Sequence, residues 1–209
     1  MSRDLRAIVC YGDSNTWGSD PGMPGRLTHG LRWTTVLRHE VGPDYDVISE
    51  GLGGRTAGFD DPALPGRNGR DHLLACLWSH APIWAVVIML GTNDTKAVFH
   101  ASATDIAHKI EDLVILIKEQ VPGPDDTLPR ILIVAPPPLG PLSRSGGSWD
   151  TAGVDESLLL AQAYHDVAER HGTLFLDAAT IIESSRLDGV HLDADAARML
   201  GVNVAQQLR

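Results

Sequence analysis

The sequence predicts an α/β protein built on a parallel β-sheet. Short apolar runs alternate with longer segments of helical periodicity, which is typical of repeated strand–helix–strand units. The runs 85–90 and 131–134 are apolar at every position, as expected for strands that helices cover on both faces. We therefore expect a sheet enclosed between two layers of helices.

Five segments are predicted to be strands. In chain order they are 5–11, 46–49, 84–90, 130–135 and 173–176. The third and fourth contain the continuous apolar runs, so we expect them at the centre of the sheet.

Three helices are predicted most clearly. The first has apolar residues at helical spacing from Ile106 to Val121, with Thr104 or Asp105 as its N-cap. A second pattern runs from Leu158 to Ala168 and ends near Gly172, because glycine readily adopts the left-handed conformation that ends helices. The last is predicted over 194–208.

One long irregular segment, 136–153, is rich in proline, glycine and serine. Loops of this length are uncommon inside a compact domain unless they serve a site. The segment follows a predicted central strand, so it should emerge at the carboxyl edge of the sheet, where open α/β folds bind ligands.

The composition is that of a globular protein. The chain of 209 residues is 43% hydrophobic and 21% charged, and we expect a single domain over 1–209. A net charge of −10 without a basic run disfavours nucleic acid as a partner. No secretory signal is recognised at the N-terminus and no apolar stretch approaches membrane-spanning length, so no membrane partner is expected.

The chain has two cysteines, Cys10 in a predicted strand and Cys76 in a predicted helix. Two such residues indicate neither a disulfide framework nor a thiolate metal site. There is also no His-Glu-x-x-His run, so we expect no metal and no other cofactor. A reducing cytoplasm fits this cysteine usage best.

Ser14 is the candidate nucleophile. It lies in Gly12-Asp13-Ser14, directly after the first predicted strand, where a tight turn would present its hydroxyl at the carboxyl edge of the sheet. A serine hydroxyl also needs a base to remove its proton. The tripeptide alone is more often a turn or a helix cap than a nucleophile site, so the assignment depends on other segments.

Among nine histidines, His191 is the best-placed base. It lies in a loop between the fifth strand and the last helix, and Asp188 is three residues before it. Asp188 can accept a hydrogen bond from Nδ1 while Nε2 faces Ser14. Asp193 is a competing carboxylate, although its position fits the N-cap of the last helix better. The other histidines lack such a carboxylate partner; they are residues 29, 39, 72, 80, 100, 108, 165 and 171.

Acyl transfer also needs hydrogen-bond donors for the developing oxyanion. The N–H groups of Ser14 and Gly54 and the side-chain amide of Asn93 are the candidates, since each follows a predicted strand. Each segment alone reads as a turn. Together with the Asp188/His191 segment, they supply nucleophile, base, acid and oxyanion donors at one edge of one sheet.

These four segments resemble the blocks of the SGNH, or GDSL-type, hydrolase family. Ser14 corresponds to its nucleophile, Gly54 and Asn93 to its block Gly and Asn, and Asp188 with His191 to its Asp-x-x-His pair. The resemblance covers nearly the whole chain and implies a flavodoxin-like three-layer α/β/α sandwich with a five-stranded parallel sheet.

Within the family, the sequence is most similar to the bacterial aryl esterase, acyltransferase and perhydrolase subgroup. The supporting stretches are 12–18, 32–34, 50–56 with 60–62, 89–96 and 136–139. The chain departs from the pattern at Asn15, where the family name has Leu, and at Gly53, which is smaller than the residue often found there. The resemblance also implies a homo-oligomer.

The predicted reaction is hydrolysis of short-chain acyl or aryl esters through an acyl-enzyme, with acyltransferase or perhydrolase activity where the pocket excludes water. Asn15, Trp17, Gly53 and Trp149 are predicted to contact the substrate. Trp33 is a further pocket candidate, with core packing as its alternative. Carbohydrate acetyl ester hydrolysis at the same site remains an alternative. A flavodoxin-like nucleotide-binding module is the non-enzymatic alternative, although no phosphate-binding glycine motif follows any strand.

Overall fold

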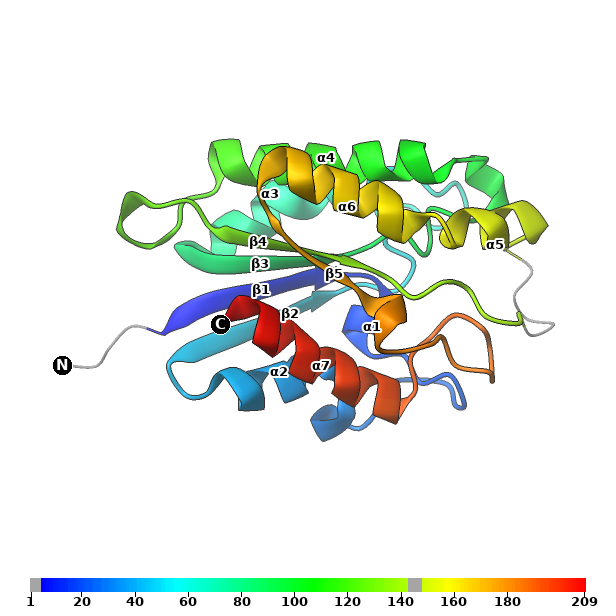
Figure 1. Ribbon diagram of the computed structural model, residues 1–209, viewed down its shortest axis with the longest axis horizontal. Helices are drawn as coiled ribbons and strands as arrows, with labels where there is room; N and C mark the ends of the chain where they lie inside the picture. The colour runs from blue at the N-terminus through cyan, green and yellow to red at the C-terminus, as the bar shows by residue number, and fades with distance from the viewer. Residues whose placement is uncertain (1–4, 143–147) are drawn as a thin grey trace.

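The computed structural model describes residues 5–142 and 148–209, which form a three-layer α/β/α sandwich (Figure 1). The middle layer is a five-stranded parallel sheet in the order β2-β1-β3-β4-β5. Its strands are β1 (Arg6–Gly12), β2 (Tyr45–Gly51), β3 (Ile83–Met89), β4 (Arg130–Ala135) and β5 (Leu174–Asp177). The predicted fold class and all five strands are therefore confirmed, with ends shifted by at most two residues.

Helices cover both faces of the sheet (Figure 1). On one face lie α3 (Gly69–His80), α4 (Ala103–Gln120) and α6 (Leu160–His171), preceded by α5 (Thr151–Ser157); on the other lie α2 (Trp33–Val41) and α7 (Ala194–Leu208). A one-turn helix, α1 (Ser14–Trp17), follows β1 directly. Four short 3-10 helices complete the description: η1 (His29–Leu31), η2 (Ala97–Phe99), η3 (Pro124–Asp126) and η4 (Ala178–Thr180).

The alternation of side chains along β3 explains the two-sided core. Val86 and Ile88 pack into the cluster beneath α3, α4 and α6, whereas Val87 and Met89 pack against α2 and α7. All four side chains are buried. A strand buried on both faces needs apolar residues at every position, which is why β3 shows a continuous apolar run.

The helix ends confirm two predicted caps and correct a third. Gly172 ends α6 in the left-handed conformation with φ of 60°, and the Asp193 carboxylate accepts the Ala196 N–H at 2.9 Å as the N-cap of α7. The N-cap of α4 is Ser102, not Thr104 or Asp105. Ser102 and Asp105 form a capping box: Ser102 Oγ accepts the Asp105 N–H at 3.1 Å, and Asp105 Oδ2 accepts the Ser102 N–H at 3.0 Å. Asp105 therefore supports the N-cap residue and is not itself the N-cap.

α2 was not predicted, and the segment expected to be irregular up to residue 153 enters α5 at Thr151. Residues 143–147 of that segment lie outside the described residues. Of the helices in 5–142 and 148–209, none combines the length and apolar character that crossing a membrane requires.

Candidate active site

Ser14 is the first residue of α1, at the carboxyl end of β1. Two glycines allow this turn to lie close against the sheet. A Cβ on Gly12 would be 2.0 Å from Thr16 Oγ1, and one on Gly51 would be 2.0 Å from the Trp17 nitrogen. Any side chain at either position would therefore displace α1, and Ser14 with it.

The structure brings Ser14, His191 and Asp188 together as predicted. His191 Nε2 lies 2.9 Å from Ser14 Oγ, and His191 Nδ1 lies 2.6 Å from Asp188 Oδ2. An ionised carboxylate only accepts hydrogen bonds, so Nδ1 carries the proton and Nε2 is free to accept one from Ser14. These contacts meet the geometric requirement for a nucleophile, a general base and an orienting acid.

Asp188 is held by its own loop. Its Oδ1 accepts the N–H groups of Val190 at 2.9 Å and His191 at 3.0 Å. Partial burial alone would raise the pKa of Asp188, but these two backbone bonds and the His191 ring outweigh burial and lower the pKa below its usual value. Asp188 is therefore ionised at neutral pH.

The two other predicted segments reach the same edge of the sheet. Gly54 lies in the turn after β2 with φ of 80°, a conformation that favours glycine, and Asn93 follows β3. The Asn93 amide donates to the backbone oxygen of Arg55 at 3.1 Å and, over a longer 3.4 Å, to Asp13 Oδ2. Within the described part of the chain, the N–H groups of Ser14 and Gly54 have no hydrogen-bond acceptor.

Arg55 connects these segments, a role that the sequence did not reveal. Its side chain is 6% exposed, and its guanidinium lies 4.1 Å from the centre of the Tyr11 ring. Nη1 donates to the backbone oxygen of Gly12 at 2.9 Å and to that of Glu50. Arg55 thereby joins the Ser14 turn to the end of β2. Its own carbonyl oxygen accepts the hydrogen bond from the Asn93 amide.

A buried ion pair joins the Gly54 and Asn93 loops further along. Lys96 Nζ lies 2.9 Å from Asp61 Oδ2, and the two side chains are 9% and 5% exposed. Burial alone would raise the pKa of Asp61, but Lys96 and the Ala63 N–H outweigh it and lower the pKa. Both residues fall in stretches that resemble the family, but their pairing is visible only in three dimensions.

Two further carboxyl groups, Asp13 and Asp94, are buried next to the site. Burial raises the pKa of Asp13 to about 6, against the opposing effects of the Asn15 N–H and the charges of His191 and Arg55. Burial raises the pKa of Asp94 to about 7, opposed by the Ala57 N–H and reinforced by the charge of Asp13. Asp94 Oδ1 accepts that N–H at 2.8 Å, while Oδ2 has no partner within the described residues.

Asn15, a predicted substrate contact, has its side-chain amide directed at the protein backbone. The side chain is buried, and both of its amide atoms are bonded to the backbone of Val190 and Leu192. Asn15 lies at the carboxyl edge of the sheet, as expected, and its amide is bonded to the backbone of the protein.

Of the other predicted substrate contacts, Trp149 lines a cavity, Gly53 borders open space and Trp17 is partly buried. Trp149 lines a cavity of about 590 Å³ with Leu139 and Pro141, and its Nε1 donates to Thr92 O and Thr95 Oγ1, both at 3.1 Å, beside the Asn93 loop. A Cβ added to Gly53 would have no heavy atom of the described residues within 4 Å, its two chain neighbours aside. Trp17 is partly buried, with the Arg26 guanidinium 4.7 Å from its ring centre.

Trp33 is a core residue. Its side chain is 1% exposed and packs with α7 residues beneath the sheet. The core alternative therefore holds for this tryptophan.

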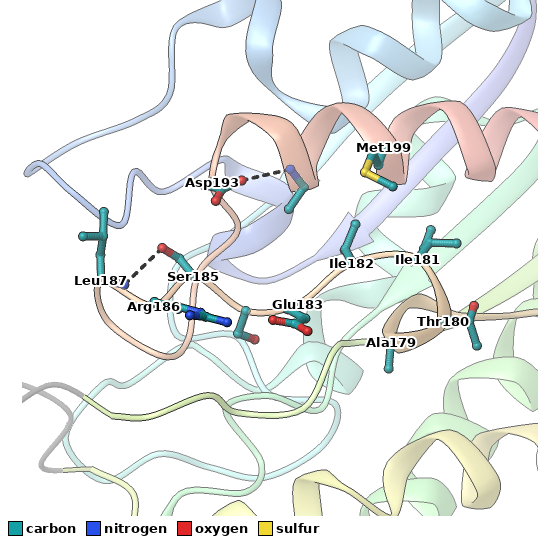
Figure 2. A pocket seen from close by; sticks show the side chains of 12 residues that line it. Ala179, Thr180, Ile181, Ile182, Glu183, Ser185, Arg186, Leu187, Asp193 and Met199 are labelled. Atoms are coloured by element: carbon teal, nitrogen blue, oxygen red, sulfur yellow. Dashed lines mark hydrogen bonds between the residues drawn. The ribbon is translucent and has the colours of Figure 1, made fainter.

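A second cavity, of about 650 Å³, lies beside the loop that carries Asp188 and His191 (Figure 2). It is lined by residues 179–187, by Asp193 at the N-cap of α7, and by Ala196 and Met199 within that helix. Figure 2 shows Arg186 and Leu187 at this cavity, and the two residues directly precede Asp188 in the sequence. Neither Ser14 nor His191 lines this cavity, so its volume does not mark the reaction centre.

Among the residues that the structure describes, two groups of side chains have the composition of possible metal ligands. Glu50, Cys76 and His80 bring one ligand atom each within 4.8 Å of the others, as do His165, Asp166 and Glu169 on the exposed face of α6. In the first group, Glu50 Oε1 and His80 Nε2 are already paired at 2.9 Å. The hydrogen bond accounts for this pair without an ion.

Comparison with known proteins agrees with this geometry. Residues 10–199 match the GDSL-like Lipase/Acylhydrolase family. The chain therefore belongs to this family, and the predicted reaction class, ester hydrolysis by an SGNH-type enzyme, is confirmed. A search of the curated proteins found no match.

Several solved structures are similar over their full length. The aryl esterase of M. smegmatis has 39% identity and a TM-score of 0.92, with 98% of this chain and 99% of that chain covered. Est24, a carbohydrate acetylesterase from Sinorhizobium meliloti, has 35% identity and a TM-score of 0.91, with 97% and 98% covered. The two relatives share the fold with this chain and differ in the esters that their descriptions name.

Proposed function

We propose that the protein is a serine esterase that hydrolyses short-chain acyl or aryl esters, with Ser14 as nucleophile, His191 as general base and Asp188 as the orienting acid. The observation that carries the proposal is the continuous chain of contacts from Ser14 Oγ through the His191 ring to Asp188, with distances of 2.9 and 2.6 Å. Hydrogen-bond reach between nucleophile and base, with the base oriented by a third group, is the requirement for activating a serine.

In the proposed reaction, His191 Nε2 takes the proton of Ser14 as Oγ attacks the ester carbonyl carbon. Asp188 stabilises the imidazolium that forms. The tetrahedral intermediate then expels the alcohol, which takes the proton from His191 and leaves an acyl-Ser14 ester. A water molecule attacks this ester with His191 again as base, and the carboxylic acid leaves.

The oxyanion of each intermediate would be bound by the N–H groups of Ser14 and Gly54 and by the Asn93 amide. The two backbone groups are available because no described residue accepts from them. For Asn93, the weaker contact is the 3.4 Å one to Asp13, so we propose that a substrate oxygen replaces Asp13 as its acceptor. The 3.1 Å bond to Arg55 would keep the amide in place.

The proposed catalytic serine is tested by Ser14→Ala. Turnover of p-nitrophenyl acetate should fall on the order of 10³- to 10⁶-fold, because no other group can form the acyl-enzyme. The far-UV circular dichroism spectrum should remain unchanged, which controls for folding. A fluorophosphonate probe should label the wild-type protein and not the variant. Near-normal hydrolysis by Ser14→Ala would exclude the mechanism.

The proposed substrate class rests on the relatives and on the site. Aryl esters are favoured by the subgroup resemblance, while a carbohydrate acetylesterase among the relatives supports acetylated sugars as the second candidate. Trp149 and Gly53 remain proposed substrate contacts, since one lines a cavity beside the Asn93 loop and the other faces open space. Comparing kcat/KM for p-nitrophenyl acetate and acetylated xylose distinguishes the two, because a carbohydrate acetylesterase should clearly prefer the sugar.

Three finer proposals concern side reactions, assembly and location. An alcohol or hydrogen peroxide would intercept the acyl-enzyme wherever water is excluded, which product analysis in mixed water and alcohol would detect. A homo-oligomer is proposed and is checked by the solution mass. A cytoplasmic location is proposed from the low cysteine content.

A further inference from the structure

Asn15, the neighbour of the nucleophile, is bonded to the backbone on both sides of His191. Its amide oxygen accepts the Leu192 N–H at 3.0 Å, and its amide nitrogen donates to the Val190 carbonyl at 3.3 Å. The side chain is 4% exposed. A single asparagine therefore satisfies two backbone groups that flank the proposed base.

Asn15 is itself well fixed. It belongs to the same one-turn helix as Ser14, and its own N–H donates to Asp13 Oδ1 at 2.9 Å. Since Ser14 and Asn15 are consecutive, the two bonds connect the nucleophile turn directly to the loop that carries His191.

Other contacts hold the loop only in part. The Gly140 N–H donates to the Gly189 carbonyl at 2.8 Å and restrains the loop from the side of residues 136–142. The Ser185 N–H donates to the His191 carbonyl at 2.8 Å and restrains the loop from within. Residues Ser185–Leu187 and Asp193 line the 650 Å³ cavity, so tight packing is absent on that side (Figure 2). The bonds from Asn15 restrain the two peptide groups nearest the imidazole.

We propose that Asn15 is a positioning residue, which holds the His191 imidazole in line with Ser14 Oγ through the backbone of Val190 and Leu192. Leucine, the residue in the family name, has a similar size but neither donor nor acceptor. It would leave both backbone groups buried without a partner. The inference rests on the proposed function, because it requires His191 to be the base.

Asn15→Leu tests the inference. The expected result is a fall of about 10- to 100-fold in kcat for p-nitrophenyl acetate, because a displacement of about 1 Å at a reacting group costs up to about 10²-fold in rate. KM should change less than about threefold, since the side chain does not face the substrate. The rate of fluorophosphonate labelling of Ser14 should fall in parallel with kcat. Asn15→Asp keeps the acceptor for Leu192 and loses the donor to Val190, so its kcat should be intermediate.

Val204→Ala is the control for a general loss of stability. Val204→Ala creates a cavity at a fully buried position of α7 and should lower the free energy of unfolding without lowering kcat at 25 °C. Wild-type kcat in Asn15→Leu, or an equal loss of kcat in Val204→Ala, would overturn the proposal. If Asn15→Leu does not fold, wild-type kcat in Asn15→Asp overturns it instead. Full activity in His191→Ala would refute the proposed function itself, which is a different outcome.

Discussion

At the scale of single residues, the proposed chemistry depends on the orientation of the His191 ring. Asp188 and Asp193 both lie near this histidine in sequence, yet only Asp188 contacts the ring. Asp193 uses Oδ1 to accept the N–H of Ala196 and so begins α7. The two carboxylates therefore have separable roles, one catalytic in our proposal and one structural.

Asp188→Asn should lower kcat by roughly 10³- to 10⁴-fold with a much smaller change in KM. Asparagine can keep accepting the N–H groups of Val190 and His191 through its oxygen. The asparagine NH₂ would then donate to Nδ1, and the imidazole proton would lie on Nε2. A protonated Nε2 cannot accept a hydrogen bond from the Ser14 hydroxyl. Steady-state kinetics on p-nitrophenyl acetate measures the effect. Asp193→Asn is the matched control and should keep activity, because asparagine is an equally good N-cap; equal losses in both variants would contradict the assignment.

The sequence predicted which residues the candidate site would contain better than what each would contact. Ser14, Asp188 and His191 could be proposed because each lies in a short local motif at the end of a predicted strand or before a predicted helix. The interaction of Asn15 could not, because its partner carbonyl lies 175 residues further along the chain. Arg55 was missed for the same reason, since hydrogen bonds to distant backbone oxygens leave no local pattern.

At the scale of elements, the loops after β2 and β3 act together. One carries Gly54 and the other Asn93, and the Lys96–Asp61 pair joins them at 2.9 Å. Although solvent reaches little of the pair, Asp61 lies near the molecular surface. The contribution of the Lys96–Asp61 pair to the free energy of unfolding should therefore be smaller than that of a deeply buried pair.

Lys96→Met should lower the free energy of unfolding by on the order of 2 kcal/mol, because it leaves the Asp61 carboxylate covered and without its cation. Chemical denaturation at pH 7 measures the loss. The double variant Lys96→Met/Asp61→Leu should recover part of it, since no uncompensated charge remains. Arg170→Met, which removes an exposed partner of Glu111, should have little effect. A loss as small as that of Arg170→Met would show that the pair does not hold the loops together.

Elements were predictable where burial imposes a repeating pattern. The strands β3 and β4 and the helix α4 have such patterns and were found within a few residues. The N-cap of α4 was misplaced because Ser102 and Asp105 satisfy each other, and either residue type is a good cap. α2 escaped prediction because its core contacts, Trp33 and Leu37, are separated by polar residues such as Thr34 and Thr35 that are themselves buried.

At the scale of the whole molecule, buried carboxyl groups make stability depend on pH. The pKa of Asp94 is about 7 in the folded protein, against 3.8 for an ordinary aspartate. Between these values the unfolded chain has released this proton and the folded chain retains it, so the free energy of unfolding falls as pH rises from about 4 to about 7. Asp13, with a pKa of about 6, acts in the same direction.

Asp94→Asn removes one of these titrations. The variant should therefore gain stability relative to the wild type between pH 5 and pH 8, by on the order of a few kcal/mol. Urea denaturation of both proteins at the two pH values measures the difference. The opposite trend, or a difference independent of pH, would show that Asp94 is not protonated in the folded state at pH 5.

The distance along the chain between Ser14 and His191 has a further consequence. Their contact of 2.9 Å joins residues 177 positions apart, and His191 precedes α7, which packs on α2 and the sheet. Ester turnover can therefore report on long-range order: any partial detachment of α7 that moves this loop should silence the enzyme before the sheet unfolds. During heating, loss of activity should accordingly precede loss of the circular dichroism signal.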